Sequence, residues 1–234
     1  MMGLKRFVVG TGLGVLVGYG TLMSIPSNNL SRHLEEAHRT NVGMGDTNIE
    51  FLLEFKNTIL QEAREHRIPA AYLAAVLLEE NYDRPRWEDV KENVATVLGY
   101  DTTLGPGQVK ISTAVKLDCD ELAITRDRQE IIDRLRDPYI NIKYVARFLA
   151  HRKAHTANAR GLDNEGFLHN PKQMVLVGSQ YVNGLRAEEN WYGYSVVMNL
   201  KDVPNVFFDG ESKPIVEMAL NYVRQNGRDA LSKF

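Results

Sequence analysis

The sequence contains very little cysteine, because Cys119 is the only one in 234 residues. No disulfide can therefore form within the chain, and we expect this lone thiol to be a small core residue rather than a nucleophile. Positive charge is not in excess either: 28 Lys and Arg residues stand against 30 Asp and Glu residues, a net charge of -2. Nucleic-acid-binding surfaces usually need a basic surplus, so we expect no nucleic-acid partner.

Internal repeats, low-complexity tracts and alternating strand–helix units are also missing from the sequence. The last of these absences excludes a parallel-sheet α/β fold. Most of the chain instead consists of segments in which apolar residues recur at helical spacing. We therefore expect an all-α fold, mainly helical and α+β at most.

An uncharged run occupies residues 7–25, preceded by Lys5 and Arg6 and ended by Pro26. At ~1.5 Å per residue, a helix over this run would be roughly 29 Å long, which is about the thickness of the bilayer core. The run predicts a transmembrane anchor within residues 1–26, with the body of the protein on the periplasmic side of a bacterial inner membrane. A cleaved signal segment is the alternative, and the protein would then be secreted.

We divide the rest of the chain into a polar linker over 27–46, a main domain over 47–190 and a C-terminal extension over 191–234 that packs on this domain. The main domain begins with an amphipathic helix from Thr47 to His66 that Asp46 or Thr47 can cap. Pro69 then opens a helix that is apolar on every side and should be buried. The remaining expectations are helices over 87–98, 111–117, 174–181 and 211–223, a long helix starting at 137–138, a glycine-rich loop over 102–107, and a strand over 192–200 paired with 206–208.

Two carboxylates, Glu79 and Glu80, end the apolar run over 70–78. A carboxylate at a helix C-terminus faces the negative end of the helix dipole, and apolar surroundings disfavour its charge. Both effects favour the protonated acid, which glycosidic cleavage needs because the leaving sugar oxygen must receive a proton. Taken alone, the pair is more typical of solvated residues at a fraying helix end than of a catalytic site.

The segment over 103–114 supports the catalytic interpretation. In it Gly105 is followed by two residues and then Gln108, and later by Ser-Thr-Ala at 112–114. This pattern resembles the second signature of the soluble lytic transglycosylase family, which shares its fold with goose-type lysozyme. The family's first signature is an apolar helix that ends in Glu-Ser with an aromatic residue two positions later. Residues 76–82 resemble it, which assigns the catalytic position to Glu79, with Glu80 in the serine position as the alternate acid.

Two later segments follow in the order of the family. Residues 137–142, continuing to Phe148 and Leu149, resemble its Asp-Pro-x-x-Asn-Ile helix. Residues 180–184 resemble its Tyr-Asn-x-Gly block, with Val182 where asparagine is usual and Asn183 displaced by one. The resemblance covers about 50–190. It implies a lysozyme-like domain that cleaves the β-1,4 bond of peptidoglycan between N-acetylmuramic acid and N-acetylglucosamine, with glycan strands as its partner and no cofactor or metal.

Roles for the site residues follow from their chemistry. The glycines at 105 and 107 would let backbone approach a sugar closely, and Gln108 offers both a donor and an acceptor. By the resemblance, Tyr181 hydrogen-bonds Glu79, and Asn183 lies in the substrate-binding block. Asn141 is expected to be a structural residue at a helix start. Four aromatic residues could stack on sugars, although packing is the commoner use of each: Trp87, Trp191, Tyr192 and Tyr194.

The choice between hydrolase and transglycosylase depends on a second carboxylate, which a hydrolysing glycosidase normally needs. Asp83 and Asp101 are candidates for it, but neither lies in a recognisable motif. The family in its transglycosylase form uses one glutamate, which protonates the leaving oxygen and then takes a proton from the substrate's own 6-hydroxyl to close a 1,6-anhydro sugar. We favour this chemistry, with a goose-type hydrolase as the alternative.

Two further alternatives stay open: a catalytically silent protein that binds or assembles the wall, and a wall peptidase. A peptidase would need metal ligands or a Cys/His pair, and the sequence contains no HExxH pattern around its histidines. The cellular context also stays open, including a role within an envelope-spanning machinery.

Overall fold

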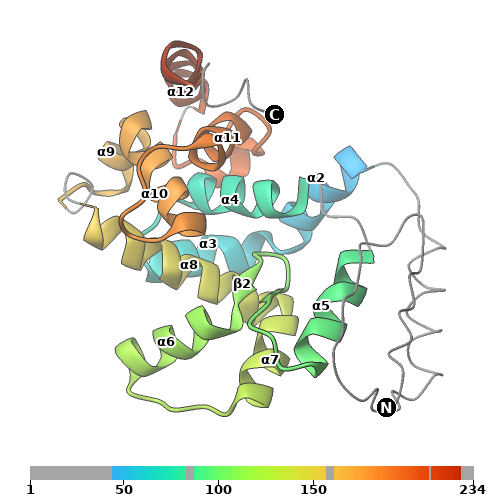
Figure 1. Cartoon of the computed structure of the whole chain (residues 1–234). Helices are drawn as coiled ribbons and strands as arrows, with labels where there is room; N and C mark the ends of the chain where they lie inside the picture. Colours follow the sequence, from blue (N-terminus) through green and yellow to red (C-terminus); the bar gives the residue numbers. More distant parts are fainter. Residues whose placement is uncertain (1–43, 83–86, 157–160, 211, 228–234) are drawn as a thin grey trace, which may run out of the picture. The chain divides into compact units, whose positions relative to one another are not determined.

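The structure is a computed structural model, and it describes residues 44–82, 87–156, 161–210 and 212–227. These residues belong to one compact unit, Thr40–Phe234. Their regular structure is almost entirely helical (Figure 1), which confirms the expected mainly helical class. Within the described part of the chain, no helix combines the length and the apolar character that crossing a membrane requires. The anchor expected over 7–25 lies outside the described residues.

The elements come in the following order. The first part of the chain forms α2 (Met44–Glu54), α3 (Lys56–Glu65), α4 (Ala70–Tyr82), α5 (Trp87–Val97), β1 (Thr103–Leu104), β2 (Val109–Lys110) and α6 (Ile111–Leu122). The second part forms α7 (Arg128–Arg136), α8 (Pro138–His155), α9 (Asn164–Leu168), α10 (Pro171–Asn183), α11 (Trp191–Asn199), the 3-10 helix η1 (Asn205–Phe207) and α12 (Ser212–Asn226).

Helix α4 runs through the middle of the unit, and α2, α3 and α11 pack against it (Figure 1). Every residue from Ala70 to Leu78 is buried, as the apolar pattern predicted. Pro69 precedes the helix, where a proline costs no helical hydrogen bond. The polar end of α4 therefore emerges from the core with its two glutamates at fixed positions.

The first amphipathic segment forms two helices instead of one. Helix α2 already begins at Met44, so the predicted caps at 46 and 47 lie inside it. At Phe55 the backbone leaves the helical conformation (φ -93°, ψ 13°), and α3 begins one residue later. The Phe55 ring is buried and meets the edge of Tyr139 with ring centroids 5.0 Å apart. The break thus turns a large aromatic side chain into the core.

Helix α8 begins where the sequence predicted. The side chain of Asp137 accepts hydrogen bonds from the backbone N–H of Tyr139 and Ile140, and Pro138 is the first helical residue. An acceptor side chain before a proline at the first helical position is a strong helix start. The first N–H groups of a helix have no carbonyl acceptor within the helix, so the side chain accepts from them, and proline has no such N–H to satisfy. The first residue of α8 is therefore well defined, and it determines which side chains of this long helix face each neighbouring element.

The strand predicted over 192–200 is wrong, because this segment is helix α11. The hairpin partner predicted over 206–208 is wrong too, since η1 occupies it. Helix α11 crosses α10 where Gly178 faces Gly193, and a Cβ on Gly193 would lie 2.0 Å from the carbonyl oxygen of Val175. The close crossing buries the aromatic and β-branched residues that suggested a strand.

Helices α6, α7 and α8 are joined by a buried ion-pair network. Asp118 is fully buried and accepts from Arg147 (2.7 Å), from Arg126 (2.9 Å) and from the hydroxyl of Tyr144 (2.6 Å). The next residue, Cys119, points to solvent, so the expectation of a core thiol is wrong.

Candidate active site

A two-stranded antiparallel ribbon carries the glutamine of the second signature. Leu104 pairs with Val109, and the four residues between them form the turn. The sequence had indicated only a loop here. Gly105 (φ 73°) and Gln108 (φ 46°) both have left-handed backbone conformations, which a tight turn of this kind requires.

Side chains from three helices hold the turn in place. Asn81 at the end of α4 donates to the carbonyl of Pro106 (2.7 Å), and Tyr181 of α10 donates to that of Gly107 (2.5 Å). Asn141 of α8 accepts from the Gly107 N–H (2.8 Å) and donates to the carbonyl of Leu104 (2.8 Å). The structural role expected for Asn141 is thus confirmed. These bonds give the turn a fixed position beside the end of α4.

A cavity of about 420 Å³ lies beside this turn. This volume is within the range of ligand sites in proteins. The ribbon, helix α6, helix α8 and the C-terminal end of α10 all contribute to its walls. Its lining residues are Glu80, Thr103, Gln108, Val109, Lys110, Thr113, Phe148, Arg152, Tyr181, Val182, Asn183 and Gly184.

Glu80 is the carboxylate of this cavity. It is the only acidic residue among the described residues that line it. The hydroxyl of Tyr192, on α11, donates a short hydrogen bond to Glu80 Oε1. Because a buried phenol holds one of its oxygens, the carboxyl group has a defined orientation within the cavity wall.

Glu79 lies on a different side of α4 and is not among the residues that line the cavity. Its Oε2 accepts from Ser195 Oγ (2.7 Å) and from Asn199 Nδ2 (2.7 Å), both on α11. Successive residues of a helix point about 100° apart, so the two neighbouring glutamates leave α4 in different directions. Glu79 therefore joins α4 to α11.

Two buried tyrosines border Glu80. The rings of Tyr181 and Tyr192 are stacked, with centroids 6.1 Å apart. Burial raises the pKa of Tyr181 well above its ordinary value, and the nearby charge of Glu80 adds to the effect. The pKa of Tyr192 is raised well above its ordinary value for the same two reasons in the same order. Both hydroxyls therefore stay protonated at physiological pH and act as hydrogen-bond donors. Tyr181 gives its bond to the ribbon turn, whereas the resemblance had implied Glu79 as its acceptor.

Gln108 points its amide back into the turn. Its oxygen accepts from the hydroxyl of Thr103 (2.7 Å), and its nitrogen donates to the carbonyl of Gly105 (3.0 Å). An amide offers two donors and two acceptor sites, so each end keeps capacity for a ligand in the cavity. The two hydrogen bonds within the turn fix the orientation of the Gln108 amide, and with it the directions of the remaining donor and acceptor sites.

The two glycines of the turn face helix α8 and not the cavity. A Cβ on Gly107 would lie 2.0 Å from the side chain of Val145, and one on Gly105 would lie 2.3 Å from the amide of Asn141. Neither glycine is among the residues that line the cavity, and their expected role beside a sugar stays a prediction. Their missing side chains let the ribbon lie directly on α8.

Of the other predicted site residues, one lines the cavity, one lies outside it and one is not among the described residues. Asn183 is exposed at the end of α10 and lines the cavity, as a substrate-binding residue would. Asp101 is outside the cavity, where it accepts from the backbone N–H (2.9 Å) and the hydroxyl (2.7 Å) of Ser112 at the start of α6. Asp83 lies outside the described residues. Asp101 thus acts as a helix cap, and the structure gives no second carboxylate facing Glu80 among the described residues.

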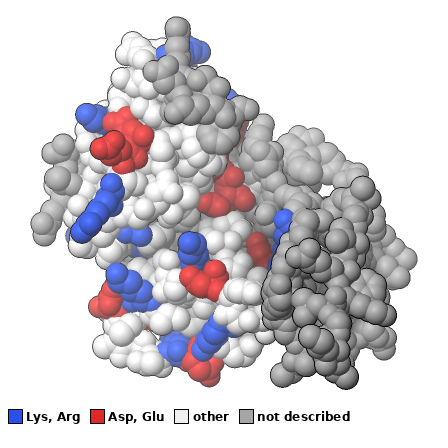
Figure 2. Space-filling view, in the orientation of Figure 1, with Lys and Arg blue, Asp and Glu red and all other residues white. Residues whose placement is uncertain are grey.

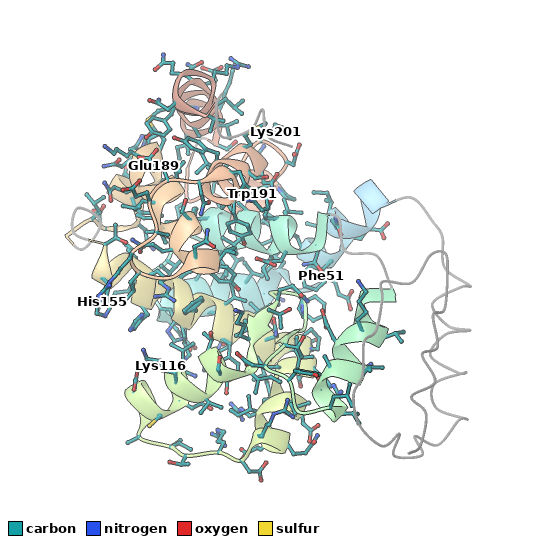
Figure 3. The ribbon with its side chains drawn as sticks, viewed as in Figure 1. Phe51, Lys116, His155, Glu189, Trp191 and Lys201 are labelled. Atoms are coloured by element: carbon teal, nitrogen blue, oxygen red, sulfur yellow. The ribbon has the colours of Figure 1, made fainter. Side chains whose placement is uncertain are left out.

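Of the four candidate aromatics, Tyr192 contacts Glu80 directly. Trp191 begins α11 (Figure 3) and is 40% exposed, with its ring 5.8 Å from that of Tyr192. Tyr194 is buried and donates to Glu189 (2.7 Å). The side chain of Trp87 lies outside what the structure describes.

Several residues of the cavity wall were not predicted to be part of the site, and Lys110, Phe148 and Arg152 are among them. Phe148 and Arg152 are four residues apart on α8, so they share one face of the helix. The Arg152 guanidinium lies over the Phe148 ring, 4.3 Å from its centroid. The i,i+4 spacing after the aromatic residue of the third motif was the signal that could have indicated Arg152.

One cluster of the described residues has the composition of a metal site, but it lies elsewhere. Ligand atoms of Glu62, Glu65 and His66 lie within 4.8 Å of one another. The ammonium group of Lys143 lies 3.9 Å from Glu62 and 3.8 Å from Glu65, so a cation already compensates these acids. None of these residues lines the cavity.

On the face shown in Figure 2, acidic and basic side chains are interspersed among uncharged ones. This face thus has no broad electrostatic potential of one sign, and recognition of a ligand at the cavity depends on individual side chains. In comparisons with known proteins, no protein-family model matches the chain. No curated protein matches it either.

Proposed function

We propose that the chain cleaves the β-1,4 bond of peptidoglycan between N-acetylmuramic acid and N-acetylglucosamine, as a lytic transglycosylase with a lysozyme-like domain. The observation that carries the proposal is that Glu80 and Gln108 line one cavity, with Tyr181 and Asn183 in its wall. These residues come from the motifs that resemble the family. Motifs from distant parts of the sequence that converge on one ligand-sized cavity are expected of a glycan-binding site.

We assign the acid to Glu80, the alternate acid of the sequence interpretation. Glu80 lines the cavity, whereas Glu79 is held on another face of α4 by Ser195 and Asn199. Tyr192 donates to Oε1 of Glu80, which fixes the orientation of the carboxyl group. A positioned acid needs this kind of orientation, since proton transfer depends on geometry before anything else.

The reaction needs no atom from outside the substrate. Protonated Glu80 gives its proton to the glycosidic oxygen, the bond from that oxygen to the muramyl C1 breaks, and the sugar ring carries the positive charge. The carboxylate then accepts the proton of the muramyl 6-hydroxyl as its oxygen bonds to C1. The products are a free 4-hydroxyl on the leaving glycan and a 1,6-anhydro muramyl end, and Glu80 is again protonated.

The transglycosylase chemistry is favoured over goose-type hydrolysis by the carboxylates. A hydrolysing enzyme places a second carboxylate roughly 5 to 9.5 Å from the first, across the bond that breaks. Among the described residues that line the cavity, Glu80 has no such partner, and Asp101 caps α6.

We propose a location in the bacterial cell envelope, because peptidoglycan lies there. The uncharged run over 7–25, with basic residues before it, supports an inner-membrane anchor that leaves the catalytic unit in the periplasm. Cleavage of this segment would give a secreted enzyme with the same site.

A matched pair of variants tests the assignment. We expect Glu80→Gln to lower the rate of wall solubilisation by roughly 10²- to 10⁴-fold, the usual cost of removing a general acid. Glu79→Gln should keep most of the activity, because Gln can still accept from Ser195. The measurement is clearing of purified peptidoglycan, with thermal unfolding as the check on folding. Full activity in Glu80→Gln, or loss only in Glu79→Gln, would contradict the assignment. A wild-type chain that binds glycan without cleaving it would indicate a silent wall-binding protein.

A further inference from the structure

Arg152 is an unusual residue for the wall of a sugar-binding cavity. It lines the cavity together with Glu80, and its Nε atom is buried without a hydrogen-bond partner. The structure pairs its guanidinium with no carboxylate of the described residues. The guanidinium carbon instead lies 4.3 Å from the centroid of the Phe148 ring.

A half-buried cation without an anionic partner costs free energy. Burial lowers the pKa of Arg152, because the site disfavours its charge, yet arginine remains protonated at any physiological pH. Buried polar groups in proteins are almost always hydrogen-bonded, so each exception needs an explanation. Nε itself is buried, but the Arg152 side chain lines the cavity, so an anionic ligand there can bind the rest of the guanidinium and compensate its charge.

The geometry of the residue favours an anion with two oxygens. The guanidinium carbon lies over the Phe148 ring, and a planar guanidinium that packs on a ring binds ligands through the N–H groups at its edge. That edge matches the two oxygens of a carboxylate. Lys110 brings a second positive charge to the same cavity. Among the described residues that line the cavity, two basic side chains, Arg152 and Lys110, therefore accompany one acidic side chain, Glu80.

We propose that Arg152 binds a carboxylate of the glycan substrate and thereby selects acidic wall glycan over neutral β-1,4 polymers such as chitin. This inference rests on the proposed function and names its substrate class. Two carboxylates of wall glycan have the required chemistry: that of the lactyl group of a peptide-free muramyl unit, and those of the stem peptide. Chitin oligomers have neither.

Binding to the uncleaving full-length chain tests this directly. In a Glu80→Gln background, calorimetry would compare five ligands. They are a peptide-free wall tetrasaccharide, the same glycan with stem peptides, the carboxylate-amidated form of each of these two, and chitotetraose. We expect the carboxylate-bearing ligands to bind roughly 10- to 100-fold more tightly than the amidated forms, as for a charge-assisted hydrogen bond. The two carboxylate-bearing arms distinguish the lactyl from the peptide source.

Variants of the cation then identify the residue responsible. Arg152→Gln should reduce this affinity ratio to about one, and Arg152→Lys should give an intermediate ratio, because it keeps the charge and loses the planar edge. Arg224→Gln is the matched control, since Arg224 lies exposed on α12 and its side chain bonds to Asn221 of the same helix. It should leave the ratio unchanged.

The outcomes separate this inference from the proposed function. A ratio near one with Arg152 present, or a ratio that survives Arg152→Gln, overturns the carboxylate site even if wall is cleaved in a Glu80-dependent way. A high ratio that depends on Arg152 supports the site even if the wild-type chain fails to cleave wall. Binding of none of the ligands overturns both.

Discussion

Glu79 and Glu80 differ by one position in the chain and have different surroundings. Glu80 lines the cavity beside Tyr192, whereas Glu79 bonds to Ser195 and Asn199 of α11. A motif comparison aligns sequence positions, and a shift of one residue leaves the apolar run before the glutamates almost equally well matched. The rotation of about 100° per residue then decides which carboxylate reaches the cavity.

The hydrogen bond from Tyr192 to Glu80 can be tested with Tyr192→Phe. We expect a loss of roughly 10- to 100-fold in wall cleavage, because the acid loses the donor that orients it while the ring still fills its place. Turnover on purified peptidoglycan is the measurement. Tyr194→Phe is the control: it also removes a hydroxyl from a carboxylate, that of Glu189, but away from the cavity. Cleavage by Tyr192→Phe at the wild-type rate would contradict the role of this bond.

Several single residues were predictable because their function is local. Asp137 caps the helix that comes after it, and Pro138 starts that helix, as their neighbours in the sequence indicate. Partners distant in the chain were not predictable. Tyr181 bonds to Gly107, 74 positions away, and the sequence gives no means of choosing that acceptor over Glu79.

The ribbon depends on its glycines for close packing on α8. We expect Gly107→Ala to lower the free energy of unfolding by about 1 to 3 kcal/mol, because the new Cβ would overlap the buried Val145 side chain. The displaced turn should also lower wall cleavage. Gly210→Ala is the matched control, since a Cβ there has no atom within 4 Å, and it should change stability by less than about 0.5 kcal/mol. Denaturant unfolding of both variants is the measurement, and equal stabilities would contradict the packing argument.

The network around Asp118 should set part of the acid sensitivity of the fold. Burial opposes ionisation of Asp118, but hydrogen bonds from Arg147 and Tyr144 and the charge of Arg147 outweigh it, so the pKa of Asp118 is lowered. A lowered pKa contributes stability at every pH above the unfolded value of about 3.9, and this contribution is lost as the pH falls through the folded value.

Asp118→Asn should therefore destabilise the protein by about 3 to 5 kcal/mol near neutral pH, because Arg147 is left buried without its counter-charge. The difference from wild type should shrink as the pH falls below about 4. Unfolding free energies measured from neutral to acidic pH check both expectations. The exposed neighbour Asp120 supplies the control variant Asp120→Asn. A difference that stays constant with pH would contradict the account.

Helix α11 shows why local pattern was insufficient for one element. Tyr192, Tyr194 and Val196 alternate along the chain, which is typical of a strand. All three are buried in a helix, together with Val197, because the segment is covered on more than one side by α4, α10 and α12. Its close crossing with α10 depends on Gly178 meeting Gly193, a pairing that only the folded chain reveals.

Over the whole compact unit, the boundary predicted at residue 190 separates elements that belong together. Helix α11 begins just after this boundary and packs on α4, the helix that carries both glutamates. It supplies Tyr192 to one glutamate and Ser195 and Asn199 to the other. The family resemblance ends near residue 190, and residues 191–234 were predicted to form an extension packed on the main domain. Helix α11 does pack on α4, and the sequence did not indicate that its side chains also bond to both glutamates.

The central claim is that Glu80 alone, without a water nucleophile, cleaves the glycan. Mass spectrometry of fragments released from purified peptidoglycan by the wild-type chain, in water enriched in heavy oxygen, tests it most directly. We predict muramyl ends in the 1,6-anhydro form that carry no heavy oxygen, and no such fragments from Glu80→Gln. Reducing ends that have incorporated one heavy oxygen, or anhydro fragments that persist in Glu80→Gln, would contradict the account.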